Sequence, residues 1–254
     1  MSDLNFEVSD LNFEVCIDSV VGANIAQEAG AHRVELCQAL SVGGTTPSAA
    51  MIQRVRATCQ LGLHVLIRPR GGDFCFNDEE WAIMARDVEL AGEWGADGVV
   101  IGGLRDDGTV DGDHCARLID LARPMSATFH RAFDLCSDAH VALEELVDLG
   151  VDYVLTSGQA ATAHEGRDLL RQLVDVAADR LIVLAGAGIN EHNVRELVCH
   201  SRVQELHFSA RSTCHVVEAV RQVSMGSDAR ADLVRDETDL GRVRAIIHAA
   251  ISMA

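Results

Sequence analysis

Lysine is absent from the sequence, and all 21 of its basic residues are arginine. Schiff-base formation, the anchoring of pyridoxal phosphate and general-base catalysis by an amine all need a lysine side chain. These reaction classes are excluded, so an enzyme with this sequence would use acid–base or metal-assisted chemistry. The sequence leaves open whether the protein is an enzyme.

Positive charge is also scarce, because 21 basic residues against 39 acidic ones give a formal net charge of −18. Nucleic acids and anionic membranes are bound through clustered basic residues, so we expect neither as a partner. No stretch approaches the roughly 18 uninterrupted apolar residues of a membrane helix. The N-terminus lacks the basic and apolar regions of a signal peptide. A cytoplasmic location is therefore the expectation.

The eight cysteines include no Cys-x-x-Cys pair, and their density is far below that of a disulfide scaffold. A structural zinc site is therefore not expected. In a reducing compartment, most of these thiols should be buried as small apolar side chains.

Eight short β-rich runs alternate with amphipathic helical segments, and no linker rich in Pro, Gly or Ser divides them. Eight strand–helix units in about 250 residues predict a single (β/α)8 (TIM) barrel domain. The alternative, an open doubly wound sheet, would carry a phosphate-loop fingerprint after its first strand, and none is present. The predicted strands are Phe13–Ile17, Arg33–Cys37, His64–Arg68, Gly98–Gly102, Ser126–His130, Tyr153–Ser157, Leu181–Gly186 and Glu205–Ala210.

Signals for helix starts agree with this plan. Asn77 precedes three acidic residues that suit a helix N-terminus, and Pro47 after Thr46 predicts a helix capped by Thr46. The polar stretch Cys214–Glu237 has no clear strand pattern, so we predict a long loop there, either without regular structure or with one short helix. The predicted helices include Pro47–Cys59, Asp78–Trp94, Ala139–Leu149 and Leu240–Ile251.

The N-terminus contains a duplication, because the segment SDLNFEV occurs at Ser2–Val8 and again at Ser9–Val15. One copy is enough for a first strand. We therefore assign residues 1–12 to an extension outside the barrel and residues 13–254 to the barrel itself.

Strand alternation predicts a polar barrel interior. Successive side chains of a strand point to opposite faces, and the apolar set should face the surrounding helices. Barrel interiors are usually filled by branched apolar side chains. The alternation places these polar or sulfur-bearing side chains inside: Glu14, Cys16, Glu35, Cys37, His64, Arg68, Thr128, His130, His207 and Ser209.

An acid–base site is one interpretation of this interior. Glu14 or Glu35 would act as general base, and His130 would be either the acid or a partner of the acid. Asp134 would orient His130 or bind a metal. Three arginines would clamp a small anionic or polyol substrate; they are Arg68, Arg70 and Arg131. The alternative is a satisfied glutamate–arginine network without chemistry.

The loops after the last two strands are the usual phosphate-binding corner of such barrels. Gly186 and Gly188 allow close approach of a ligand to the backbone, and Ser209 and Arg211 would complete an anion site. An ordinary tight turn followed by a helix cap explains the same residues equally well.

Between Phe13 and Thr213 the sequence resembles the CutC family of copper homeostasis proteins. The duplicated start and the stretch Cys214–Glu237 depart from the family pattern. The motifs that carry the resemblance are RVELC (Arg33–Cys37), GGTTPS (Gly43–Ser48), IRPRGGDF (Ile67–Phe74), TFHRAFD (Thr128–Asp134), LTSG (Leu155–Gly158), AGAGI (Ala185–Ile189) and FSAR (Phe208–Arg211).

The resemblance implies a (β/α)8 barrel, a link to copper, and assembly into homodimers or higher oligomers. The thiol pair proposed for the family corresponds to Cys16 and Cys37, on neighbouring predicted strands. Thiolates select Cu(I) in a reducing cytosol, and Arg68 nearby would favour the thiolate form. Two hypotheses therefore stand: a Cu(I)-binding protein of copper homeostasis, and an acid–base enzyme acting on a small molecule.

Overall fold

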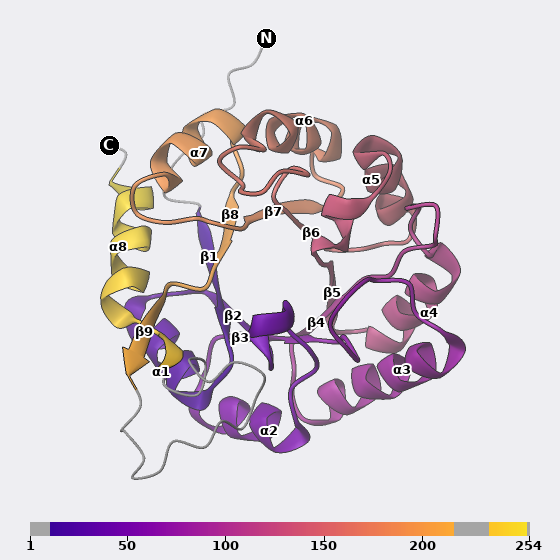
Figure 1. The fold of residues 1–254 in the computed structure, drawn as a ribbon, viewed down its shortest axis with the longest axis horizontal. Helices are drawn as coiled ribbons and strands as arrows, with labels where there is room; N and C mark the ends of the chain where they lie inside the picture. Colours follow the sequence, from indigo (N-terminus) through magenta and orange to yellow (C-terminus); the bar gives the residue numbers. More distant parts are fainter. Residues whose placement is uncertain (1–10, 216–233, 253–254) are drawn as a thin grey trace.

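A closed parallel barrel forms the centre of the molecule in the computed structural model, which describes residues 11–215 and 234–252. Its strands follow one another around the barrel in chain order, so every connection is a strand–helix–strand crossover (Figure 1). The (β/α)8 prediction is confirmed. The barrel strands are β1 (Asn12–Ile17), β2 (Arg33–Leu36), β3 (Gly62–Leu66), β4 (Gly98–Ile101), β5 (Ser126–Phe129), β6 (Tyr153–Thr156), β7 (Ile182–Gly186) and β8 (Glu205–Phe208).

Helices surround the barrel and cover the outer face of its sheet (Figure 1). Short 3-10 helices, η2 (Leu40–Val42) and η3 (Arg131–Leu135), lie in the loops that follow β2 and β5. The α-helices are α1 (Val20–Ala29), α2 (Ala49–Thr58), α3 (Asp78–Glu93), α4 (Gly112–Ala122), α5 (Ala139–Asp148), α6 (Arg167–Ala177), α7 (Val194–Ser201) and α8 (Leu240–Ile251).

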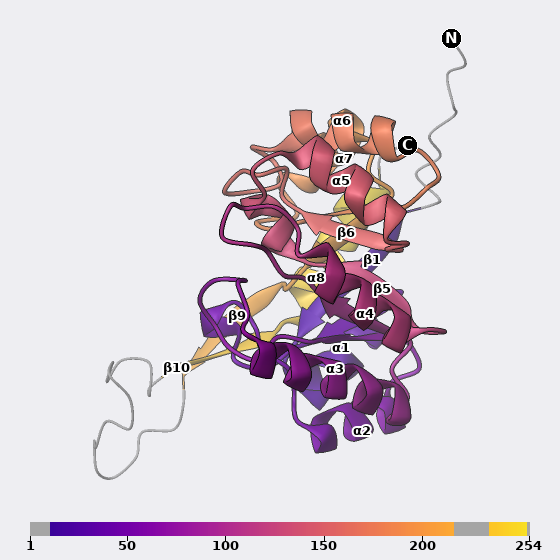
Figure 2. The same ribbon diagram turned by 90° about the vertical axis from the view of Figure 1, so that its right-hand side faces the viewer.

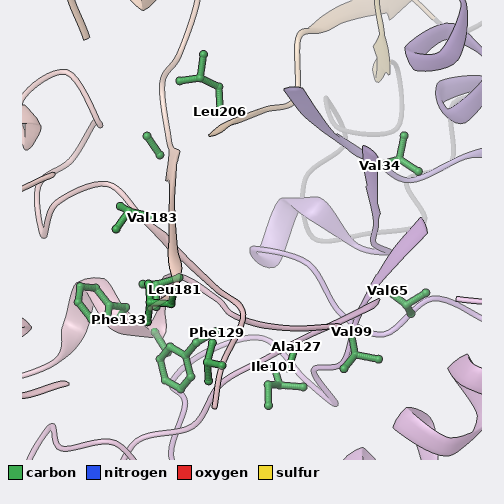
Figure 3. Packing of buried hydrophobic residues seen from close by; sticks show 14 of the residues in the cluster. Val34, Val65, Val99, Ile101, Ala127, Phe129, Phe133, Leu181, Val183 and Leu206 are labelled. Carbon is green, nitrogen blue, oxygen red and sulfur yellow. The ribbon is translucent and has the colours of Figure 1, made fainter. Parts of the chain in front are cut away.

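The main apolar core lies between the strands and the helices. Figure 3 shows Val34, Val65 and Val99 pointing away from the barrel axis, and all three side chains are fully buried. A separate small apolar cluster lies inside the barrel and contains Cys16, Cys37, Leu66 and Val100. Strand alternation therefore predicted correctly that the thiols face inward, away from the main core.

The N-terminus of α2 differs from its prediction. Thr46 does not cap this helix, because its backbone N–H and its Oγ1 are hydrogen bonded to the carbonyl oxygen and the N–H of Arg68, at 2.9 Å each. The helix begins at Ala49, and the Ser48 side chain accepts a hydrogen bond from Met51 N. Asn77 caps α3 as predicted, in a capping box with Glu80.

The stretch after β8 also differs from its prediction. Its described ends form an antiparallel pair, β9 (Arg211–His215) with β10 (Val234–Thr238), where a loop was predicted. Figure 2 shows this pair projecting from one end of the barrel. The middle of the stretch, residues 216–233, lies outside the described residues, as does most of the predicted N-terminal extension. Within the described ranges, no helix is long and apolar enough to cross a membrane.

Candidate functional site

A cavity of about 130 Å³ lies at the carboxyl ends of the barrel strands. This is the end at which (β/α)8 enzymes bind their ligands. Side chains from β1, β2, β3, β6 and β8 contribute, together with the loops after β2, β3 and β5. The lining residues are Cys16, Glu35, Cys37, Leu40, Gly43, Leu66, Arg68, Phe74, His130, Arg131, Leu155 and His207.

Two sulfurs and a carboxylate lie together in this cavity. The register of β1 and β2 places Cys16 opposite Glu35, with Cys37 just beyond the end of β2. The two Sγ atoms are 3.8 Å apart, and Cys37 Sγ lies 3.4 Å from Glu35 Oε2. All three residues are buried, and their ligand atoms lie within 4.8 Å of one another. Among the described residues, this is the one group of three or more potential metal ligands.

The thiol pair is held in an asymmetric protonation state. A hydrogen bond from Cys37, together with one from His207, outweighs burial and lowers the pKa of Cys16 to about 5. The pKa of Cys37 is raised because it keeps its proton in that bond and because it is buried beside the Cys16 thiolate. Burial, and then the negative charge of Cys16, raises the pKa of Glu35 to about 8. Near neutral pH the site therefore holds one thiolate and a carboxyl group that can exchange a proton.

His207 connects this group to a network deeper in the barrel. Its Nδ1 lies 2.7 Å from Glu14 Oε1, and its Nε2 lies 3.6 Å from Glu35 Oε2. Burial by itself would lower the pKa of His207, but hydrogen bonds with Cys16 and Glu14 outweigh burial and raise it well above its usual value. The imidazolium thus stabilises the thiolate from the side of β8.

Glu14 is further neutralised by an arginine from the next strand. Arg33 Nε lies 2.5 Å from Glu14 Oε2, and Arg33 Nη2 lies 2.7 Å from Glu205 Oε2. Burial would raise the pKa of Glu14, but the charges of Arg33 and His207 outweigh it and lower that pKa. Glu14 therefore belongs to a satisfied ion network, in agreement with the alternative that assigned it no chemistry. It contacts the cavity only through His207.

His130 and Arg68 differ from the residues of this ion network, because each has a buried donor atom that no described residue accepts from. His130 Nδ1 accepts a hydrogen bond from Ala132 N at 3.2 Å, and burial followed by the charge of Arg68 lowers the pKa of His130 to about 3. The terminal nitrogens of Arg68 donate hydrogen bonds to the carbonyl oxygens of Val42, Gly44 and Gly72. His130 Nε2 and Arg68 Nε have no hydrogen-bond partner within the described part of the chain.

Asp134 does not orient His130, contrary to its predicted role. Its carboxylate accepts hydrogen bonds from Thr156 Oγ1 at 2.5 Å, from Ser157 N at 3.0 Å and from Arg131 Nε at 2.7 Å. It ties η3 to the end of β6. The backbone N–H of Ala132 orients His130 instead.

The predicted three-arginine clamp is not assembled. Arg70 pairs with Glu80 at 2.5 Å and with Asp73 at 3.1 Å, and it does not line the cavity. Arg131 reaches the cavity, but it pairs with Asp134. Of the three predicted members, only Arg68 brings a buried guanidinium to the cavity that pairs with no carboxylate of the described residues.

The predicted phosphate corner is organised as a turn. Arg211 donates to Asp18 Oδ2 at 2.8 Å, and Ser209 is exposed. A side chain at Gly188 would collide with Thr162, 2.9 Å from the position of its Cβ. Helix α7 starts only at Val194, several residues after Gly186. These contacts agree with the tight-turn alternative for this corner.

Three polar residues of the site received no role from the sequence. They are Arg33, Glu205 and His207, which lie buried or nearly buried inside the barrel. Alternation carried the necessary signal for two of them, because Arg33 is two residues before Glu35 and Glu205 is two residues before His207. Phe74 was also missed. Its ring lies 4.6 Å from the Arg68 guanidinium and 4.8 Å from the His130 ring.

A family model described as the CutC family matches residues 11–212 of this chain. The chain belongs to the CutC family. Among its CutC relatives, a CutC family protein of Histophilus somni is 45% identical over 93% of this chain and 98% of its own length. A copper homeostasis protein cutC homolog of Mus musculus is 44% identical over 92% of this chain and 87% of its own length.

Solved structures agree on the architecture. A CutC protein of Streptococcus agalactiae has a TM-score of 0.74 at 30% identity, covering 78% of this chain and 98% of its own. Phosphoribosyl anthranilate isomerase of Thermotoga maritima has a TM-score of 0.57 at 13% identity, covering 95% of this chain and 99% of its own. The second likeness concerns the barrel fold alone.

Proposed function

We propose that this CutC family protein binds one Cu(I) ion between the sulfurs of Cys16 and Cys37 and acts in copper homeostasis. The observation that carries the proposal is the buried sulfur pair, whose Sγ atoms lie 3.8 Å apart at the ligand end of the barrel. Soft thiolates favour Cu(I) over harder ions. Relatives named for copper homeostasis support the same role.

The chemistry of the surrounding groups fits this ion. Metal binding requires deprotonated thiols and releases protons. With its pKa lowered to about 5, Cys16 is already a thiolate at neutral pH. Glu35 is a hard ligand that Cu(I) does not favour, and with its pKa raised to about 8 it is mostly protonated near neutral pH. Its Oε2 lies 3.4 Å from Cys37 Sγ. The two cysteines are thus the ligands, and Glu35 is a positioning residue.

The test is an anaerobic titration of the reduced full-length protein with Cu(I), in competition with a chromophoric Cu(I) chelator. We expect one ion per chain and loss of at least 100-fold in affinity, about 3 kcal/mol, in Cys16→Ser and in Cys37→Ser. Cys199→Ser, which changes an exposed thiol away from the cavity, is the matched control. Unchanged stoichiometry and affinity in a folded Cys16→Ser/Cys37→Ser variant would contradict the proposal.

The acid–base enzyme is the less supported proposal, because Arg70 and Arg131 are engaged elsewhere and Asp134 does not orient His130. We retain the cytoplasm as the proposed location, since a reducing compartment keeps the thiol pair free. A homodimer or higher oligomer remains a proposal that rests on family membership.

A further inference from the structure

We infer that His130 Nε2 and Arg68 Nε form a binding site for the carboxylate group of a small organic acid, beside the thiol pair in the same cavity. The inference concerns donors that the copper proposal does not use. It stands whether or not Cu(I) binds.

Both atoms are buried donors for which residues 11–215 and 234–252 provide no acceptor. His130 is 5% exposed and Arg68 is 4% exposed, and both line the cavity. Because His130 Nδ1 accepts the N–H of Ala132, the ring proton is on Nε2, which makes this atom a donor. A buried donor without a partner costs about 1–3 kcal/mol, and such groups in native proteins call for an explanation. An acceptor group bound in the cavity supplies one.

Charge identifies the acceptor as an anion. The Arg68 guanidinium is bonded only to backbone carbonyl oxygens and forms no ion pair with the described residues. Uncompensated buried charge is costly, so proteins pair it with a counter-charge. The three carbonyl bonds and the Phe74 ring hold the guanidinium in place. Phe74 also packs against the His130 ring and so holds both donors.

Size and lining restrict the class of anion. A cavity of about 130 Å³ accommodates about five non-hydrogen atoms, since a cavity of about 150 Å³ accepts benzene. Leu40, Leu66 and Leu155 add apolar walls near the donors. In a carboxylate on a short hydrocarbon chain, the charged group can bind the two donors and the chain can contact the leucines. Inorganic phosphate has the size and the charge but no apolar part to contact the leucines.

The experiment uses the full-length protein at pH 7, reduced, stripped of metal by a chelator and held at constant ionic strength. Acetate, its neutral isostere acetamide, and inorganic phosphate are titrated separately. Binding is followed by calorimetry and by the 15N resonance of His130 Nε2. We expect saturable binding of acetate at one site per chain, a shift of that resonance, and at least ten-fold weaker binding of acetamide and phosphate.

Variants test the assignment of the donors. Arg68→Gln should weaken acetate binding at least ten-fold, as expected for loss of a hydrogen bond to a charged group. Arg244→Gln removes one exposed positive charge on α8 and is the matched control. Cys16→Ser/Cys37→Ser removes a negative charge from the same cavity and should bind acetate at least as tightly as the wild type does. Failure of copper binding and failure of this inference are therefore distinguishable.

Three results would overturn the inference. They are no saturable binding of acetate, binding of acetate without a shift at His130 Nε2, and acetamide or phosphate binding as tightly as acetate. The resonance is measured in the wild-type protein, so the test remains decisive even if Arg68→Gln alters the loops that Arg68 holds.

Discussion

Two histidines of the cavity have different charge states because their neighbours differ. His207 lies between Glu14 and the Cys16 thiolate, so it is held as an imidazolium. His130 lies buried near Arg68 and accepts a backbone hydrogen bond, so it is held neutral. One residue type thus supplies a fixed positive charge on one wall of the cavity and a neutral donor on another.

The neutral state of His130 predicts acid sensitivity. Its pKa falls from 6.5 in the unfolded chain to about 3 in the folded protein. Its contribution to stability is complete above pH 6.5 and is lost as the pH falls from 6.5 toward 3, at up to about 1.4 kcal/mol per pH unit. His64, whose pKa burial lowers to about 4, acts in the same direction.

We therefore expect His130→Phe to flatten the fall in unfolding free energy between pH 6.5 and pH 4, measured by urea denaturation at a series of pH values. His140→Phe, at an exposed position on α5, is the control and should retain the wild-type slope. If His130→Phe kept the full wild-type slope, His130 would not be neutral in the folded protein.

At the scale of elements, strand alternation predicted which side chains enter the barrel, because the period of two is fixed by backbone geometry. It could not predict the partners of Asp134 or Arg70. These partners depend on the conformations of loops and on contacts between residues that are several positions apart in the sequence. The pair β9–β10 was missed for a related reason. Its strands are polar on both faces and are joined through an 18-residue stretch (216–233), so no local pattern marked them.

The capping box of α3 gives a test at this scale. Asn77 Oδ1 accepts from Glu80 N at 3.0 Å, and Glu80 Oε2 accepts from Asn77 N at 3.0 Å. We expect Asn77→Ala to lower the unfolding free energy by about 1 kcal/mol in thermal or urea denaturation. Asn77→Asp retains an acceptor at the cap and should change it by less than about 0.5 kcal/mol. Equal losses in the two variants would mean that the cap bond does not stabilise the helix.

At the scale of the whole molecule, one ion network spans the seam where the barrel closes. Glu14 is on β1, Arg33 on β2, and Glu205 and His207 on β8, so the network joins the first strands of the chain to the last. All four residues are buried or nearly so. The network is complete only when β8 lies beside β1.

Removing the central arginine should therefore destabilise the barrel strongly. Arg33→Met leaves Glu14 and Glu205 buried without their shared partner, and we expect a loss of about 3–5 kcal/mol in unfolding free energy. Arg180→Met breaks the exposed ion pair with Glu144 and should cost less than about 1 kcal/mol. Denaturant titration of both variants checks the difference, and similar small losses in the two would show that the seam network contributes little.

The position of this network in the chain also bears on how the protein is made. A ribosome releases β1 and β2 early, but Glu205 lies 172 residues after Arg33, and His207 lies 193 residues after Glu14. A nascent polypeptide therefore carries an incomplete ion network and two open sheet edges until nearly all of the barrel has emerged. Truncated products from late stop codons or frameshifts would lack β8, and they should be recognised and degraded as misfolded chains instead of persisting as smaller barrels.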